Sequence, residues 1–347
     1  MSGCTPSTTL ISVNTSGQIS SGASNAATIS RNGRYVVWPA IASDLVLGVT
    51  SNGYTQVYLR DTCNSSSGPI SGCNPHTIAV TTNGDYHSGA GRFPAVSNSG
   101  VVVFDSSADN LVPNPSLTAG VGGVVFRADC SANPNQCPLS IVTIAPGSGA
   151  LIFSSGQTIS PDGRFIAFDS VGEDANGNTL VLPSQLPPNF PSYHVQMPPP
   201  SAMIYDSCVD SSGAVPGCIP SFAYASVDSG GNLDLTLNAR AGYPSLSDDG
   251  RLIAFPASLN LSTSYPGAGN SVYVRDTCGG SSPPASCTPS TTLVSVDGSG
   301  VAAGTVDLFP RISGDGHFVV FDSLNQFPSN TSTVLPIGRI IMVRTTY

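Results

Sequence analysis

Cysteine is the residue type with the most chemistry to offer in this chain of 347 residues, and eight of its nine cysteines come in short-range pairs. The pairs are Cys63 and Cys73, Cys130 and Cys137, Cys208 and Cys218, and Cys278 and Cys287. A zinc site would need closely spaced cysteines or nearby histidines, and the four histidines are scattered. We therefore predict four disulfides between sequence neighbours, which persist only outside a reducing cytosol.

The ninth cysteine, Cys4, has no partner of this kind. Residues 2–13 (SGCTPSTTLISV) nearly repeat residues 285–296 (ASCTPSTTLVSV), so the chain begins inside a cysteine hairpin. Cys4 is then either an orphan left by the cut in the repeat or a free thiol available for an intermolecular bridge.

The carboxylates argue against an enzyme. The chain has a single glutamate, Glu173, and many of its aspartates recur at equivalent places in a repeat. Those recurring aspartates are Asp162, Asp249 and Asp315 in turns, Asp105, Asp169 and Asp322 after a strand, and Asp61, Asp129, Asp206 and Asp276 beside the cysteines. The main enzymatic alternative is a five-bladed glycosidase, which needs two specialised carboxyls about 5–9 Å apart. We predict no catalytic residues.

One segment begins like a calcium loop, Asp174-Ala-Asn-Gly-Asn178. Thr179 replaces the glycine that such a loop requires, and Gln185 stands where a bidentate glutamate belongs. A solvated turn is the favoured interpretation over a metal site, and no cofactor is predicted.

The charge and the length of the apolar runs argue against nucleic acid as a partner and against a membrane span. Only 10% of residues are charged, the net charge is −9, and all twelve basic residues are arginine. An acidic chain with scattered arginines lacks the basic face of a nucleic-acid-binding protein. No apolar run approaches the length of a membrane span. Low charge also favours close packing of copies, because little self-repulsion opposes it.

The elements that must position these residues come from an internal repeat. The same pattern, an apolar residue, Ser, two variable residues, Gly and an apolar run, occurs at residues 29–38, 96–106, 159–170, 246–258 and 312–323. Its glycines are Gly33, Gly100, Gly163, Gly250 and Gly316. Because the step across the two termini equals a normal step, the repeat predicts a ring.

Each repeat reads as four short strands separated by Gly, Pro, Ser and Asn, and no helical stripe is present. We predict an all-β, five-bladed β-propeller of four-stranded antiparallel blades. The single domain, 1–347, divides into blades at about 15–82, 83–145, 146–228, 229–297 and 298–347 plus 1–14. Residues 8–13 are expected to pair with residues 339–344 and close the ring, which leaves no exposed sheet edge.

The segment SPDGRFIAFDS (residues 160–170), followed in such repeats by VYVRD (residues 272–276), resembles the blade of TolB-like β-propellers. The Asp-Thr-Cys hairpins at residues 61–63 and 276–278 resemble secreted bacterial members of that superfamily. The resemblance implies a fold that serves as a docking platform, a peptidase accessory domain or a surface-layer module. TolB-like propellers usually have six blades, and this chain has five repeats.

Long variable loops are expected on the face opposite the cysteine hairpins. They carry Tyr54, Tyr86, His87, Tyr193, His194 and Tyr265. These are candidate contact residues, although they could equally cover strand ends. We predict a non-enzymatic, extracellular or cell-surface module of a bacterial type, with the periplasm as an alternative.

The predicted partner is another protein or a second copy, with a polysaccharide as the alternative ligand. A ring closed by a terminal strand can close within one subunit or take the strand from the next one. In the second case the chain forms a polymer.

Overall fold

The computed structural model describes residues 7–82, 84–85, 94–114, 116–117, 123–131, 136–174, 176–185, 200–234, 241–258, 261, 270–296, 309–323 and 340–345. Nearly all regular structure in these residues is β-strand, as the turn-rich composition predicts. The helical structure described is a single 3-10 turn, η1 (Pro183–Gln185).

Four sheets have four antiparallel strands each, in the order typical of propeller blades. Sheet 1 contains β1 (Thr28–Ile29), β2 (Tyr35–Ala40), β3 (Gln56–Asp61) and β6 (His76–Ala79). Sheet 2 contains β7 (Ala95–Val96), β8 (Val101–Ser106), β9 (Val124–Asp129) and β10 (Leu139–Ile141). Sheet 3 contains β11 (Ser154–Ile159), β12 (Phe165–Ser170), β13 (Ser201–Asp206) and β16 (Ser221–Tyr224). Sheet 4 contains β17 (Ser245–Leu246), β18 (Leu252–Ala257), β19 (Ser271–Asp276) and β20 (Ser290–Leu293).

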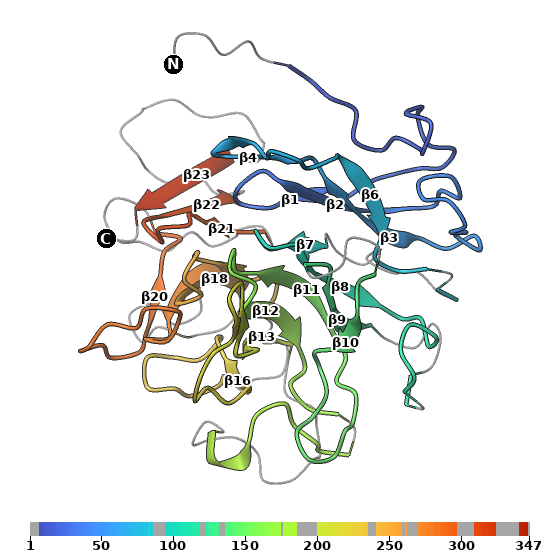
Figure 1. Ribbon diagram of the computed structural model, residues 1–347. Coiled ribbons are helices and arrows are strands. Elements are labelled where there is room, and N and C mark those ends of the chain that lie inside the picture. The colour runs from blue at the N-terminus through green and yellow to red at the C-terminus, as the bar shows by residue number, and fades with distance from the viewer. Residues whose placement is uncertain are drawn as a thin grey trace.

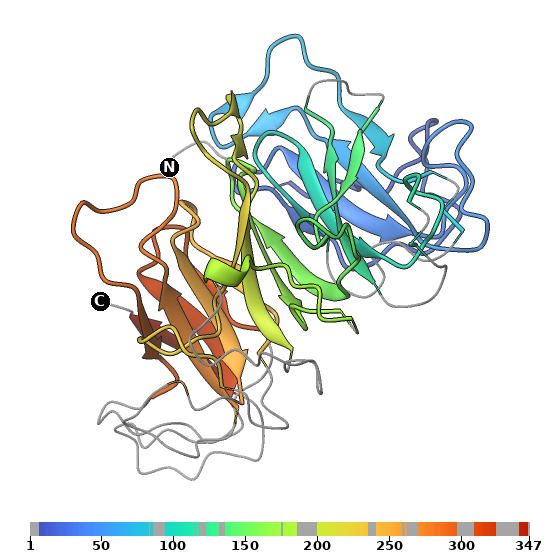
Figure 2. The same cartoon turned by 90° about the horizontal axis from the view of Figure 1, so that it is seen from below.

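Sheet 5 has three described strands, β21 (Arg311–Ile312), β22 (Phe318–Ser323) and β23 (Ile340–Thr345), so β23 is an edge among the described strands. Two cysteine hairpins carry small sheets of their own, β4 (Asn64–Ser65) with β5 (Gly68–Pro69), and β14 (Val209–Asp210) with β15 (Gly213–Ala214). The sheets follow one another around the molecule in chain order, from blue sheet 1 to red sheet 5 (Figure 1). Sheet 3 lies between the first two sheets and the last two (Figure 2).

Four hydrophobic cores lie between consecutive sheets. The core between sheets 1 and 2, for example, joins Val37 and Leu59 to Phe104 and Phe126, all of them fully buried. Equivalent cores join sheets 2 and 3, 3 and 4, and 4 and 5. A single sheet is too small to fold alone, so these cores hold the chain together.

Each of these interfaces repeats one close contact beneath a turn glycine. The glycine before the second strand of a sheet packs on the first residue of the second strand in the preceding sheet. A Cβ on Gly100 would lie 3.3 Å from the Tyr35 ring, and one on Gly250 would collide with the Phe165 ring. Val101 lies in the same way beneath Gly163, and Leu252 beneath Gly316.

The fifth interface, between sheets 5 and 1, is not formed in the described residues. In a formed interface, the Phe318 ring would pack beneath the turn glycine Gly33. Phe318 is 47% exposed, and no atom lies within 4 Å of a Cβ built on Gly33. The predicted ring is therefore not closed in this structure.

The expected pairing of residues 8–13 with residues 339–344 is wrong for the described part of the chain. The physical reason is a local turn. The Asn14 side chain accepts hydrogen bonds from the Ser16 and Gln18 amides, and Val13 pairs with Ile19. Asp44 then holds this turn against sheet 1.

The predicted single domain and its blade boundaries stay a prediction, because neither the sheets nor their contacts test them.

The turn contact gives a matched test of the sheet interfaces. Gly250 and Gly33 both have positive φ, +74° and +79°, so alanine costs about 1 kcal/mol of backbone strain at either position. We expect Gly250→Ala to lose about 1–3 kcal/mol more unfolding free energy, because the new methyl overpacks the Phe165 ring. Denaturant unfolding in dilute solution measures the difference. Equal losses in the two variants would contradict the open fifth interface.

Candidate functional site

Four disulfides join the paired cysteines, Cys63 to Cys73, Cys130 to Cys137, Cys208 to Cys218 and Cys278 to Cys287. Each closes the turn between the third and fourth strands of its sheet. In three hairpins the first cysteine takes a positive φ of 55–57°, which is unusual for a residue other than glycine. Cys4 lies outside the described residues.

A bidentate ion pair supports each of these three strained hairpins. The arginine that follows the turn glycine holds the aspartate that ends the third strand, with nitrogen–oxygen distances of 2.5–3.0 Å. The pairs are Arg34 with Asp61, Arg164 with Asp206 and Arg251 with Asp276. They meet because the register places Tyr35 opposite Asp61, and its equivalents likewise.

The same aspartates fix the cysteine backbone. Asp276 accepts a hydrogen bond of 2.8 Å from the Cys278 amide, and Asp61 does the same for Cys63. Burial raises the pKa of the Asp276 carboxyl, but hydrogen bonds from Arg251 and the Cys278 amide outweigh burial and lower the pKa below its ordinary value. Burial also raises the pKa of Asp61, but hydrogen bonds from Arg34 and the Cys63 amide outweigh burial, so the pKa lies below its ordinary value.

Sheets 2 and 5 lack this pair. In sheet 2 the turn is one residue shorter, so Val101, the counterpart of Tyr35, follows Gly100 directly and the arginine position is missing. Asp129 takes a longer contact of 3.3 Å from Arg127. In sheet 5 the two positions hold His317 and Thr345. The sequence contained a signal for the pair that was missed: Gly-Arg and a strand-ending Asp occur together in three repeats and are both absent from the last.

The structure does not gather the predicted contact residues into a site. Tyr54 is half-buried in the loop between β2 and β3, where its amide donates to the Ser51 carbonyl. Tyr86, His87, Tyr193, His194 and Tyr265 lie outside the described residues.

The acidic residues singled out in the sequence serve turns. Both carboxylate oxygens of Asp174 accept hydrogen bonds from its own loop, from the Asn176 and Asn178 amides and the Asn178 side chain. Glu173 is buried at the base of that turn, bridged to Thr179. Two further acidic residues, Asp85 and Asp109, lie close together in loops, where both are half-buried and the Asp109 amide donates to the Asp85 carboxylate at 3.1 Å. Desolvation, reinforced by the Asp109 carboxyl, raises the pKa of Asp85. Neither residue lines a cavity described in the structure.

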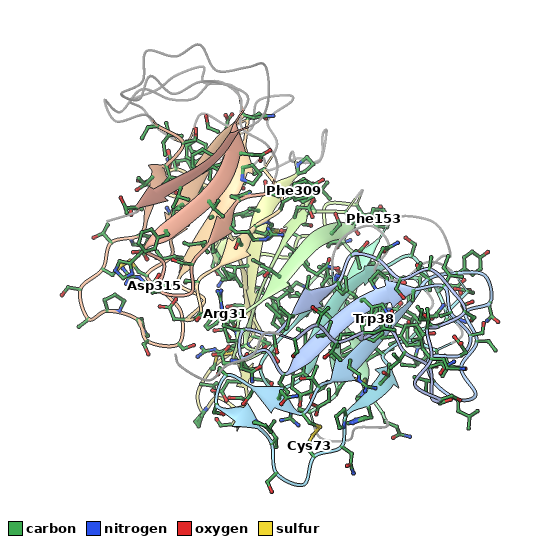
Figure 3. All side chains as sticks on the ribbon, turned by 90° about the horizontal axis from the view of Figure 1, so that it is seen from above. Arg31, Trp38, Cys73, Phe153, Phe309 and Asp315 are labelled. Carbon is green, nitrogen blue, oxygen red and sulfur yellow. A yellow bond between two sulfur atoms is a disulfide. The ribbon has the colours of Figure 1, made fainter. Side chains whose placement is uncertain are left out.

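Exposed apolar side chains gather where sheets 5 and 1 fail to meet. Ile29 is 61% exposed, whereas its four counterparts in the other inner strands are buried. Val343 in β23 is 66% exposed, whereas its counterpart Val274 is buried. We call the open faces of sheets 5 and 1, marked by Phe318 and Val343 on one and Ile29 and Gly33 on the other, the seam. The first and last sheets both face the viewer in Figure 3, with Arg31 between them in that view.

One cavity of about 410 Å³ lies at the centre of the molecule. The inner strands of all five sheets contribute to its lining, which places these sheets around one channel. Two arginines, Arg31 and Arg311, and the ring pair of Tyr243 and Phe309 also line it.

No protein-family model matches the chain, and no curated protein sequence matches it. Among solved structures, the fold aligns with TolB from Acinetobacter baumannii at 14% identity and a TM-score of 0.39, over 87% of this chain and 49% of that one. A protein assigned as TolB from Agrobacterium tumefaciens aligns at 12% identity and a TM-score of 0.42, over 94% and 78% of the two chains. An oligogalacturonate lyase from Vibrio parahaemolyticus aligns at 10% identity and a TM-score of 0.42, over 93% and 66%.

TolB proteins are thus among the matches. The chain spans about half the length of the Acinetobacter protein. Matches at such identities concern the fold alone.

The four disulfides indicate an oxidising compartment, extracellular or periplasmic. Within the part of the chain that the structure describes, no helix has the length and apolarity to cross a membrane.

The ion pair predicts how the protein responds to acid. Asp276 has a folded pKa below 3.8, so its charged form stabilises the fold above about pH 4, and this contribution is lost as the pH falls through the folded value. In Arg251→Met, burial acts on the carboxyl without the arginine. We expect a loss of about 1.5–3 kcal/mol at pH 7 and an acid transition that begins at a higher pH than in the unmodified protein.

The control is Arg31→Gln, because Arg31 pairs with Asp248 where both side chains are nearly half exposed. It should cost less than about 1 kcal/mol. Melting temperatures from pH 2 to 7 compare the variants, and identical curves would refute a structural role for the buried pair.

Proposed function

We propose that the chain is a secreted, five-bladed β-propeller without enzymatic activity, each of sheets 1 to 5 being one blade. It acts as a structural and interaction module, and its interaction surface is the seam. The occupant that fits the seam is a second copy of this chain.

The observation that carries this proposal is that the interface between sheets 5 and 1 is open, whereas the four interfaces between the other consecutive sheets are closed. Tyr35, Val101, Phe165 and Leu252 are buried against the next sheet, and Phe318 at the same position is exposed. Sheet 5 therefore presents the same apolar surface that the other sheets bury. Sheet 1 presents the complementary half, with Ile29 and the open space above Gly33. A single chain in this structure offers both halves at once.

A strand is available to complete the contact. Residues 7–13 match residues 290–296 in every position except Ile11, and residues 290–293 form β20, the fourth strand of sheet 4. In the structure Leu10 is 51% exposed, whereas its counterpart Leu293 is buried. Ile11 already packs against the cluster around Trp38 in sheet 1. Residues 7–13 thus carry the side chains of a fourth strand, and β23 has no fourth strand beside it in the described residues.

Addition of this strand to β23 of another copy joins unlike surfaces. Such a head-to-tail contact grows into a filament unless the rotation closes a ring. The sparse charge of the chain offers little repulsion between stacked copies.

The absence of enzymatic activity is part of the proposal. The single glutamate is buried in a turn, and aspartates at the repeat positions are hydrogen-bonded to cysteine amides or to their own turns. The alternative is a carbohydrate-binding or glycoside-active propeller. It is favoured by aromatic rings in the channel.

Cross-linking tests the strand addition. By analogy with Tyr273 opposite Leu293, residue 342 lies opposite residue 10. Leu10→Cys with Met342→Cys, in a Cys4→Ser background, should therefore form a disulfide between chains. We expect a ladder of oligomers on a non-reducing gel that collapses on reduction.

The control is Ile11→Cys with Met342→Cys, because a shift by one residue turns the side chain to the other face and should abolish the ladder. Cross-linked monomers would show that the strand closes on its own chain. Absence of any cross-link, or equal cross-linking in the control, would rule out the strand addition.

A polysaccharide screen tests the enzymatic alternative. We expect no release of sugar from plant, bacterial or fungal polysaccharides, because no carboxyl pair lines the channel in the described residues. Sugar release that disappears in Glu173→Gln would overturn the non-enzymatic proposal. Retention on one polysaccharide without cleavage would instead favour a carbohydrate-binding module.

A further inference from the structure

The central channel departs from the repeat at one position. The inner-strand residue directly before the apolar residue of the repeat motif is small in four sheets, Thr28, Ala95, Thr158 and Ser245, each paired with the equivalent residue of the second strand. In sheet 5 this position holds Arg311. A long cation thus stands where the fold requires only a small side chain, so packing of the sheet does not explain it.

The surroundings of Arg311 leave its charge without a counterion in the described residues. Its hydrogen bond is to the carbonyl of the preceding residue, Pro310, at 3.1 Å. Its side chain is exposed in the cavity, so a ligand can reach the guanidinium. The cavity lining contains no aspartate or glutamate, although the chain carries 21 acidic residues. The other cation in the lining, Arg31, is paired with Asp248 at 2.8 Å.

An apolar wall accompanies the charge. The rings of Tyr243 and Phe309 lie 4.8 Å apart, centre to centre, and Phe309 is 43% exposed. Ile29, Val96 and Leu246 also line the cavity. Phe309 is labelled in Figure 3. A cavity of about 410 Å³ falls within the range of small-molecule sites, which combine apolar walls with few polar groups.

We propose that the central channel binds a small organic anion, a carboxylate or phosphate ester with an apolar or planar body. The Arg311 guanidinium holds the anionic group, because a planar guanidinium donates two parallel hydrogen bonds to carboxylate or phosphate oxygens. Phe309 contacts the body of the ligand. The site shares Ile29 with the seam, but its two ligand contacts, Arg311 and Phe309, are not among the residues that define the seam.

Isothermal titration with two probes tests the site, 4-phenylbutyrate for the carboxylate and phenyl phosphate for the phosphate ester. The neutral 4-phenylbutanol is the control for the apolar body alone. We expect saturable binding of at least one anion at one site per chain, weakened by added salt, and at least about ten-fold weaker binding of the alcohol.

The matched variants are Arg311→Gln and Arg60→Gln. Arg60 lies in β3 outside the channel, where it donates to Thr77. Arg311→Gln should weaken anion binding by about ten-fold or more, and Arg60→Gln should leave it unchanged. If Arg311→Gln fails to fold, two single variants separate the contribution of the charge from that of the apolar wall. Arg311→Lys should retain anion binding, and Phe309→Ala should weaken it.

Binding of neither anion would overturn the proposal. Equal affinity for the neutral alcohol, or an equal loss in the Arg60 variant, would do so as well.

Discussion

Close packing of each sheet on the turn glycine of the next is the contact on which the rest of the molecule depends. A four-stranded sheet has two apolar faces and cannot bury both alone. The glycine lets the turn approach the neighbouring sheet, as Gly250 does over Phe165, and the core below the turn then closes. Four such contacts arrange five sheets around one channel. A fifth position with the same residues stays open, and this one unmade contact defines the seam.

The cysteine hairpins add strength on one face of the same sheets. In sheets 1, 3 and 4 the arginine, the aspartate and the disulfide form one unit, because the aspartate binds both the guanidinium and the cysteine amide. Sheet 5 lacks the arginine and the aspartate, a described fourth strand and a neighbour on one side. Among the described residues, the sheet with the fewest internal restraints is therefore also the one that presents the open face. This coincidence fits the proposed interaction surface, on which a second copy would supply the missing contacts.

Much of the fold could be predicted because the same sequence pattern recurs in each repeat. Strands such as β8 and β12, the near absence of helix and the cysteine pairs follow from patterns that recur, and recurrence averages out the noise of a single segment. The open seam could not be predicted, because Phe318 and Gly33 look the same in the sequence as residues that do make the contact. The position of residues 7–13 depends on the Asn14 turn and its contact with Asp44. This contact joins distant segments and does not recur in the repeats, so the sequence pattern could not predict it. Arg311 was visible as a departure from small residues, but its meaning required the channel.

Light scattering over a wide range of protein concentration tests the central claim, that the seam joins copies of the chain, most directly. The account predicts a mass that rises with concentration in steps of one chain of 35.3 kDa, with elongated particles in electron micrographs of the concentrated sample. A constant mass of one chain at every concentration would contradict it.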